Sequence, residues 1–172
     1  RIQHVLDTGE ATWDEGLLLI LERSGFPEET YHTFSYSPLA DDSGAIAGML
    51  CVVTEETERI IGERRLRTLR DLAVALGGAA SNDDVCRETA RVLGASSADF
   101  PFALVTVKDA AASAPRAWNA EAARPAAWPV EEVIARGRPV RLSNLDRRGY
   151  DLPPTPWGAA VAEALVLPVR TP

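Results

Sequence analysis

The sequence has few of the residues on which metal, redox and nucleic-acid chemistry depend. Of its 172 residues two are histidine and two are cysteine, and Lys108 is the only lysine. The net charge is -7 and the arginines are interleaved with acids, which leaves no basic face for DNA, RNA or anionic lipid. Cys51 and Cys86 fit no zinc, redox or disulfide spacing, so both are expected to be reduced, buried thiols. Nucleic acid is therefore not an expected partner.

Long hydrophobic runs are also missing. No apolar stretch approaches the roughly 20 residues that span a bilayer, and Arg1–Asp7 is too short and too polar for a signal peptide. The chain lacks an initiator methionine, so we expect it to be a piece of a longer, cytoplasmic protein with no membrane partner. Its 46% apolar and 25% charged residues are ordinary for a soluble globular domain.

Catalytic motifs are absent as well. The sequence has no Walker-type phosphate loop, no His-Glu-x-x-His and no Gly-x-Ser-x-Gly. His32 alternates with aromatic residues on one strand face and is expected to be a packed strand residue, and His4 has no second ligand in view. The acid pairs Glu28–Glu29 and Asp41–Asp42 fall at turn positions, where acids are usually solvated. We expect no metal, cofactor or catalytic residue, and an apolar pocket for a small ligand stays open.

What is present divides into three segments, of which the first is residues 1–57. A short helix over Ile2–Leu6 is expected to end at Gly9, since glycine supplies the positive φ of a helix stop. Period-two alternation and β-branched runs then predict strands, and the turn residues 41–44 join two of them into a hairpin. The expected three-strand antiparallel meander has its strands at Leu17–Leu21, Tyr31–Tyr36 (ended by Pro38) and Ala45–Val53.

In the second segment the hydrophobic period changes to that of a helix, predicted over Glu55–Leu76. Its apolar residues fall on one face at steps of three and four. Two arrangements are open: the helix packs on its own domain, or it pairs with a parallel copy in a dimer, which the narrow stripe and charged flanks favour. The stripe consists of Leu66, Leu69, Ala73 and Leu76.

The third segment, residues 79–172, mixes helices and strands. Ser81 with its following acids predicts a helix N-cap, and that helix should end at Gly94. Residues 110–127 are rich in alanine and proline and predict a loop or weak strand. Further strands are expected at Phe102–Val107, Pro139–Leu142 and Ala164–Val169, with a short helix over Val130–Arg136. The fold class predicted for the whole chain is α+β.

These residues also carry a resemblance to a known family. Residues 28–38 (EETYHTFSYSP) and 42–48 (DSGAIAG) resemble the last two strands of a PAS domain. Residues 56–70 (ETERIIGERRLRTLR) resemble the PAS-to-GAF linker of bacterial sensor histidine kinases. Residues 81–169 are similar to the beginning of a GAF domain, including Trp128-Pro129 and the run 164–168. The match is specific in the first two stretches and rests on order and pattern in the third.

The resemblance implies a division and a function. Residues 1–57 would be the C-terminal part of an antiparallel PAS-like meander, 58–78 an amphipathic signalling linker helix, and 79–172 the N-terminal part of a GAF-like α/β sandwich. The chain would be a non-enzymatic sensory fragment of a two-component protein, relaying a signal to a histidine kinase core in cis. A complete PAS domain would begin with two further strands, and the GAF part would lack its closing strands. The family's cyclic-nucleotide signature, bilin-attaching cysteine and phosphoacceptor box are all missing.

The resemblance also points to relay residues. In PAS proteins an acid and a threonine at the end of the last strand tie the sheet to the outgoing helix, and Glu56 and Thr57 stand there. Thr57 or Thr54 is placed to cap the helix. Arg23 or Arg59 is expected to pair with one of the two adjacent acids at the junction, and we assign the relay to Glu56, Thr57 and Arg59. A plain helix cap without a signalling role is the alternative.

The expected partner is a second copy of the chain. A three-strand sheet would leave the apolar run Leu17–Leu21 in water, and two chains would bury it while pairing their linker helices. A sensory module of a transcriptional regulator or phosphatase is the alternative function. A GAF-fold small-molecule reductase is a third, although it needs reactive thiols near a pocket and Cys51 and Cys86 fall in different segments.

Overall fold

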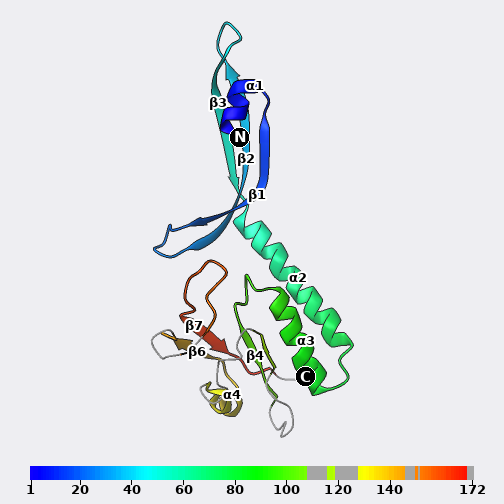
Figure 1. Ribbon diagram of the computed structural model, residues 1–172. Coiled ribbons are helices and arrows are strands. Elements are labelled where there is room, and N and C mark those ends of the chain that lie inside the picture. Colours follow the sequence, from blue (N-terminus) through cyan, green and yellow to red (C-terminus); the bar gives the residue numbers. More distant parts are fainter. Residues whose placement is uncertain (108–115, 119–127, 146–149, 151, 170–172) are drawn as a thin grey trace. The chain divides into compact units, whose positions relative to one another are not determined.

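The computed structural model describes residues 1–107, 116–118, 128–145, 150 and 152–169 of the chain. Its helices and strands make an α+β fold, as predicted (Figure 1). The chain divides into two compact units, residues 1–64 and 65–172. The division falls inside one helix, and the finer division into PAS, linker and GAF parts stays a prediction.

The first unit is built on a three-stranded antiparallel sheet in the order β1-β2-β3. Its strands are β1 (Thr12–Leu21), β2 (Glu28–Ala40) and β3 (Ile46–Glu55). The predicted meander is therefore confirmed, with strands longer than the sequence indicated. Between Asp14 and Leu17 the register with β2 shifts, and Gly16 adopts a φ of 58° there. The far ends of β1 and β2 turn away from the rest of the sheet in Figure 1.

The hairpin between β2 and β3 turns on the carboxylate of Asp41. Its Oδ1 accepts hydrogen bonds from the backbone N–H of Ser43 at 2.8 Å and of Ala45 at 3.0 Å. Gly44 closes the turn with a φ of 84°, which glycine adopts without strain. An aspartate that bonds the backbone two residues ahead is a local turn signal, so this part was predictable from sequence.

The prediction that Pro38 ends the second strand is wrong, because β2 continues to Ala40. Pro38 lies opposite Met49 of β3, whereas the ladder with β1 begins further back, where Thr12 lies opposite Tyr36. Beyond Tyr36, β2 therefore has a ladder neighbour on one side only. A proline, which lacks the N–H, is tolerated on the open side of a strand.

Helix α1 (Ile2–Thr8) packs on the sheet against β2 and β3. It ends as predicted at Gly9, whose φ of 72° lets its N–H bond the carbonyl of Val5. Val5 is fully buried, and Arg1 reaches Asp14 of β1 with a 2.7 Å ion pair. The burial of Val5 and the ion pair of Arg1 with Asp14 thus help to hold this short helix on the sheet.

Much of the sheet's apolar surface is exposed in the single chain. On one face the rings of His32, Phe34 and Tyr36 follow each other along β2 at centroid distances of 6.0 and 6.1 Å, as the alternation predicted.

Cys86 is buried as expected, but Cys51 is exposed, which corrects the prediction for that thiol. Cys51 lies on β3, an edge strand with a ladder neighbour on one side only. Exposed apolar residues also include Leu17, Leu18, Ile20, Val52 and Val53.

Helix α2 (Thr57–Gly77) is unbroken, as predicted for this segment. The predicted stripe is exposed along it: Leu66 is 68% and Leu69 62% exposed, and Ala73 and Leu76 are also exposed. The face that carries Thr68 is buried instead, and the hydroxyls of Thr68 and Ser96 share a hydrogen bond of 2.7 Å. The sequence left open whether α2 packs on its own chain or pairs with a second copy. The face that packs on the chain carries Thr68 and is not the face that carries the apolar stripe.

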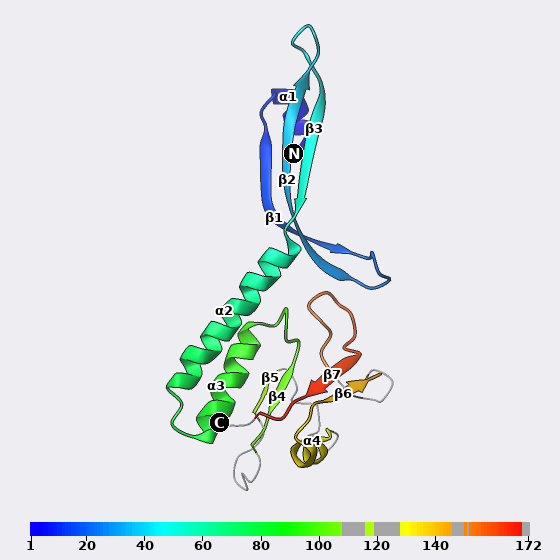
Figure 2. The same cartoon turned by 180° about the vertical axis from the view of Figure 1, so that it is seen from behind.

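In the second unit, α3 (Asn82–Ala95) contacts the small sheet of β4 (Ala103–Val105) and β5 (Arg116–Trp118) (Figure 2). The predicted N-cap is confirmed, since the Asp84 N–H donates to Ser81 Oγ at 3.1 Å. A second antiparallel pair is formed by β6 (Val140–Ser143) and β7 (Glu163–Val166). The short helix of this unit is α4 (Val130–Arg136).

The core of the second unit lies around Trp128 and Leu145. Trp128 packs at a tilt against Phe102 and Tyr150, at ring-centroid distances of 5.8 and 4.9 Å, and Leu145 is fully buried. The sequence did not single out Leu145, because it lies outside any periodic run. Of the alanine- and proline-rich stretch 110–127, β5 confirms a weak strand, and its remaining residues lie outside the described ones.

Leu145→Ala should lower the free energy of unfolding of the second unit by about 2–5 kcal/mol, the usual cost of emptying a fully buried leucine site. Denaturant titration followed by tryptophan fluorescence measures this. Leu165→Ala is the matched control, because Leu165 is exposed on β7, and it should change stability by less than about 0.5 kcal/mol. Equal effects of the two substitutions would contradict the assignment of the core.

Candidate functional site

The strongest candidate site is the junction at which β3 passes into α2. β3 ends at Glu55 and α2 begins at Thr57, so no loop separates them. The N–H of Glu56 bonds the carbonyl of Tyr31 at 2.8 Å, which keeps the chain attached to the central strand as it turns. The backbone thus leaves the sheet and enters the helix within one residue.

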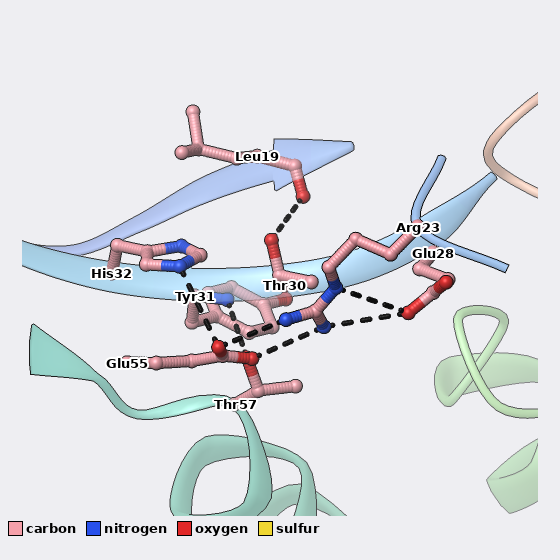
Figure 3. Close-up of polar contacts among 8 residues, drawn as sticks. All are labelled: Leu19, Arg23, Glu28, Thr30, Tyr31, His32, Glu55 and Thr57. Carbon is pink, nitrogen blue, oxygen red and sulfur yellow. Dashed lines mark hydrogen bonds and ion pairs between the residues drawn. The ribbon is translucent and has the colours of Figure 1, made fainter. Parts of the chain in front are cut away.

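Thr57 joins the first turn of α2 to the backbone of β2. Its Oγ1 accepts a hydrogen bond from the Tyr31 N–H at 3.0 Å and donates one to Glu55 Oε1 at 2.9 Å (Figure 3). The prediction that Thr57 caps the helix is therefore corrected: its hydroxyl bonds the sheet. The reason is that the Tyr31 N–H faces the side on which β3 has just ended. No strand residue follows there to accept its hydrogen bond, so it needs another acceptor.

Arg23 lies between two glutamates at the same end of the sheet. It forms two hydrogen bonds with Glu55, at 3.0 and 3.3 Å, and a 3.3 Å ion pair with Glu28 (Figure 3). The hydrogen bond to Arg23 is the main cause that lowers the pKa of the Glu55 carboxyl, followed by the one from Thr57. Of the alternatives in the sequence, the pair of Arg23 with Glu55 is confirmed.

Glu28 and Glu29 correct an expectation. The sequence placed both in a turn as solvated acids, but they are the first residues of β2, and both are half-buried and paired with arginines. The strand begins early because the ladder with β1 runs as far as the pair of Leu21 with Glu28. Sequence patterning did not show this extension, since it depends on register with a distant strand.

Glu56 joins the start of α2 to β2 and, through Thr33, to β1. Its Oε2 accepts a hydrogen bond from Thr33 Oγ1 at 2.8 Å, and Thr33 Oγ1 in turn accepts one from the N–H of Gly16 on β1 at 3.1 Å. Arg59 donates to the same carboxylate at 2.9 Å, which confirms the second predicted pair. The Thr33 hydrogen bond, then that of Arg59, lowers the pKa of Glu56. The sequence analysis did not single out Thr33. A buried threonine opposite a bulge is a place where a hydroxyl can bond a carboxylate in this way.

The histidines stand apart from any metal geometry. His32 Nε2 lies 3.8 Å from Glu55 Oε2, at the edge of the same cluster (Figure 3). His4 is exposed and pairs with Glu10 at 3.4 Å. Within the described residues, no group of three His, Cys, Asp or Glu side chains is arranged to hold a metal ion.

The junction is a set of hydrogen bonds between the sheet and the start of α2. The structure brings the predicted residues Glu56, Thr57 and Arg59 together at the start of α2, where Glu56 and Thr57 are hydrogen-bonded to β2. The predicted stripe from Leu66 to Leu76 lies further along the same helix and is not part of this cluster. The start of α2 is therefore hydrogen-bonded directly to the central strand of the sheet.

Comparisons with known proteins give no family assignment. No family model matches the chain, and no curated protein matches it with significance. Within the part of the chain that the structure describes, none of the helices has the length and apolar character needed to cross a bilayer.

The junction should weaken in acid. Hydrogen bonds hold the pKa of Glu28, Glu55 and Glu56 below the ordinary glutamate value. A lowered folded-state pKa contributes stability that is complete above about pH 4.3 and is lost as the pH falls through the folded pKa. Thermal unfolding of the first unit, followed from neutral to acid pH, should show this decline.

Glu55→Gln should flatten the acid dependence, because it removes one of the titrating groups that the junction stabilises. Asp42→Asn is the control, since Asp42 is exposed in the hairpin turn at the opposite end of the β2–β3 ladder from Glu55. An acid profile that Glu55→Gln leaves unchanged, or that both substitutions change equally, would show that the junction does not govern it.

Proposed function

We propose that the chain is the sensory and regulatory part of a two-component signalling protein, relaying a signal through α2 to a histidine kinase core in cis. The observation that carries the proposal is the loop-free junction, in which Thr57 and Glu56 hydrogen-bond the start of the helix to the central strand. The resemblance of residues 28–70 to the end of a PAS domain and its linker supports the same role. In this proposal the first unit is PAS-like, the second GAF-like, and the location cytoplasmic.

The proposed relay works by biasing the position of a helix. Arg59 bonds Glu56 at 2.9 Å and Glu63 at 3.1 Å, and its side chain is about half exposed. Exposed pairs of this kind contribute about 0–1 kcal/mol each, so they shift an equilibrium without locking it. Two states of a switch are separated by only a few kcal/mol, which such contacts can tip. A ligand or partner that moves β2 or β3 would change these contacts first.

The junction geometry supports other functions less well. A sensory module of a transcriptional regulator or phosphatase would need the same junction, and its output domain would differ. For a thiol-based reductase the support is weak, because Cys51 lies on β3 in the first unit and Cys86 on α3 in the second. A purely structural attachment of α2 is the remaining alternative, and mutation separates it from a relay.

Thr57→Val in the longer protein should change kinase output in response to the signal while costing about 1–2 kcal/mol of stability. Valine keeps the shape of threonine and removes the hydroxyl that bonds Tyr31 and Glu55. Phosphorylation assays and thermal unfolding measure the two effects. Glu58→Gln, on an exposed side chain of the same helical turn, is the control. Lost stability with an unchanged signal response would identify a structural attachment instead of a relay.

We also propose that two copies of the chain pair through the stripe on α2. Leu66, Leu69, Ala73 and Leu76 repeat at steps of three and four, the spacing of a two-helix seam, and all four are exposed in the single chain. Thr68, on another face, is the residue of α2 that is buried in the chain. The apolar stripe is thus free for a second helix.

The double substitution Leu66→Glu with Leu69→Glu should convert a dimer into a monomer, because it places charges in the seam. Light scattering at micromolar concentration measures the mass. Val74→Glu is the matched control: Val74 is more exposed than either leucine but lies off the stripe, so the dimer should persist. A wild-type chain that is already monomeric under these conditions would contradict the proposal.

A further inference from the structure

A second polar cluster joins α2 to the sheet, two turns beyond the junction. Arg64 donates from Nη1 to Glu29 Oε1 at 2.5 Å and from Nη2 to Glu29 Oε2 at 3.0 Å. The hydroxyl of Tyr31 donates to the same Glu29 Oε1 at 2.7 Å. Arginine and glutamate thus meet in a two-point pairing, which fixes direction as well as distance.

This cluster is better shielded from water than the other ion pairs of α2. The side chains of Arg64 and Glu29 are 20% and 10% exposed, whereas Arg59 of the junction is 49% exposed. Salt and solvent weaken exposed pairs far more than shielded ones. Removing one partner of a shielded pair also leaves the other charge without compensation, so the loss is large.

The spacing of the two attachments along α2 gives the cluster a specific role. Thr57 and Arg64 are seven residues apart, which is about 10 Å along a helix axis. A rod held at one point can pivot, whereas a rod held at two points has a fixed direction. The hydrogen bond at Thr57 holds the first point and the pairing of Arg64 with Glu29 holds the second.

We propose that Arg64, Glu29 and Tyr31 form a clasp that sets the direction in which α2 leaves the sheet. Its signalling meaning rests on the proposed function: with the clasp closed, α2 follows β2 as one body, and with it open the helix is held only at its first turn. These are positioning residues, since they act through the helix. The resemblance and the helical periodicity do not indicate them.

Tyr31 couples the clasp to the junction. Its backbone N–H bonds Thr57 at the first attachment, and its hydroxyl bonds Glu29 at the second. Burial, followed by the hydrogen bond to Glu29, raises the pKa of the Tyr31 phenol, so the hydroxyl keeps its proton and remains a donor. A shift of β2 at this one residue would therefore reach both attachments at once.

Hydrogen exchange of the 172-residue chain tests the clasp. Glu29→Gln should make the amides of residues 61–65 in α2 exchange about tenfold faster while the β1–β2 amides keep their rates, because local opening follows the lost contact. Glu58→Gln, the same chemical change on an exposed side chain of α2, should leave both sets unchanged. Unchanged α2 exchange in Glu29→Gln would overturn the proposal.

Two milder variants keep the test decisive if Glu29→Gln unfolds the unit. Tyr31→Phe removes only the hydroxyl, and Arg64→Lys keeps the charge without the two-point geometry; each should give a smaller acceleration confined to α2. The charge swap of Glu29→Arg with Arg64→Glu should restore part of the protection that either substitution removes alone. Acceleration spread equally over the sheet and α2 in the mild variants would show general destabilisation and would also overturn the clasp.

The exchange result and the proposed function fail separately. Exchange is measured in the chain itself and needs no kinase, so it decides whether the clasp holds the helix. Kinase output of the longer protein carrying Arg64→Lys, compared with Glu58→Gln, decides whether the helix direction carries a signal. A clasp that opens without any change in output would refute the relay and leave the positioning role intact.

Discussion

The attachment of α2 to the sheet of the first unit depends on the hydrogen bond between the Tyr31 N–H and the hydroxyl of Thr57. The ladder between β2 and β3 ends at the pair of His32 with Glu55, and the next backbone donor on the central strand is that of Tyr31. A side chain takes the place of the missing strand there, so the sheet's hydrogen bonding continues into the helix. Because no loop intervenes, this bond fixes the point at which α2 leaves the sheet, and the direction of α2 depends on the contacts further along the helix.

Local patterns were sufficient for most of this unit. Period-two alternation located β2 and apolar runs located β1 and β3. The turn residues at Asp41–Gly44 located the hairpin, and the change to a helical period located α2. The same periodicity found the exposed stripe from Leu66 to Leu76, because a stripe is a property of one helix alone. Where local signals misled, long-range register was responsible: Pro38 and Glu28 both lie within β2 because of what stands opposite them on β1 and β3.

The site was only partly predictable for the same reason. Glu56, Thr57 and Arg59 are close in sequence, and a threonine beside acids at a helix start suggests an attachment. Thr33 and Glu29 are 23 and 35 residues from the partners they contact, and nothing local distinguishes them from other polar strand residues. On a helical wheel Arg64 is one of several arginines flanking the stripe. Only the fold shows that this one faces Glu29.

The contacts of α2 also explain why its apolar stripe remains uncovered. A helix usually docks by its apolar face, which is then no longer available to a partner. Here Thr57, Glu56 and Arg64 attach the first part of the helix through polar contacts, and Thr68 bonds Ser96 of the second unit on a face that also carries half-buried Leu72. Because these attachments use other faces, the stripe stays in water in a single chain. The proposed pairing with a second copy would therefore not require α2 to give up its polar attachments to the sheet.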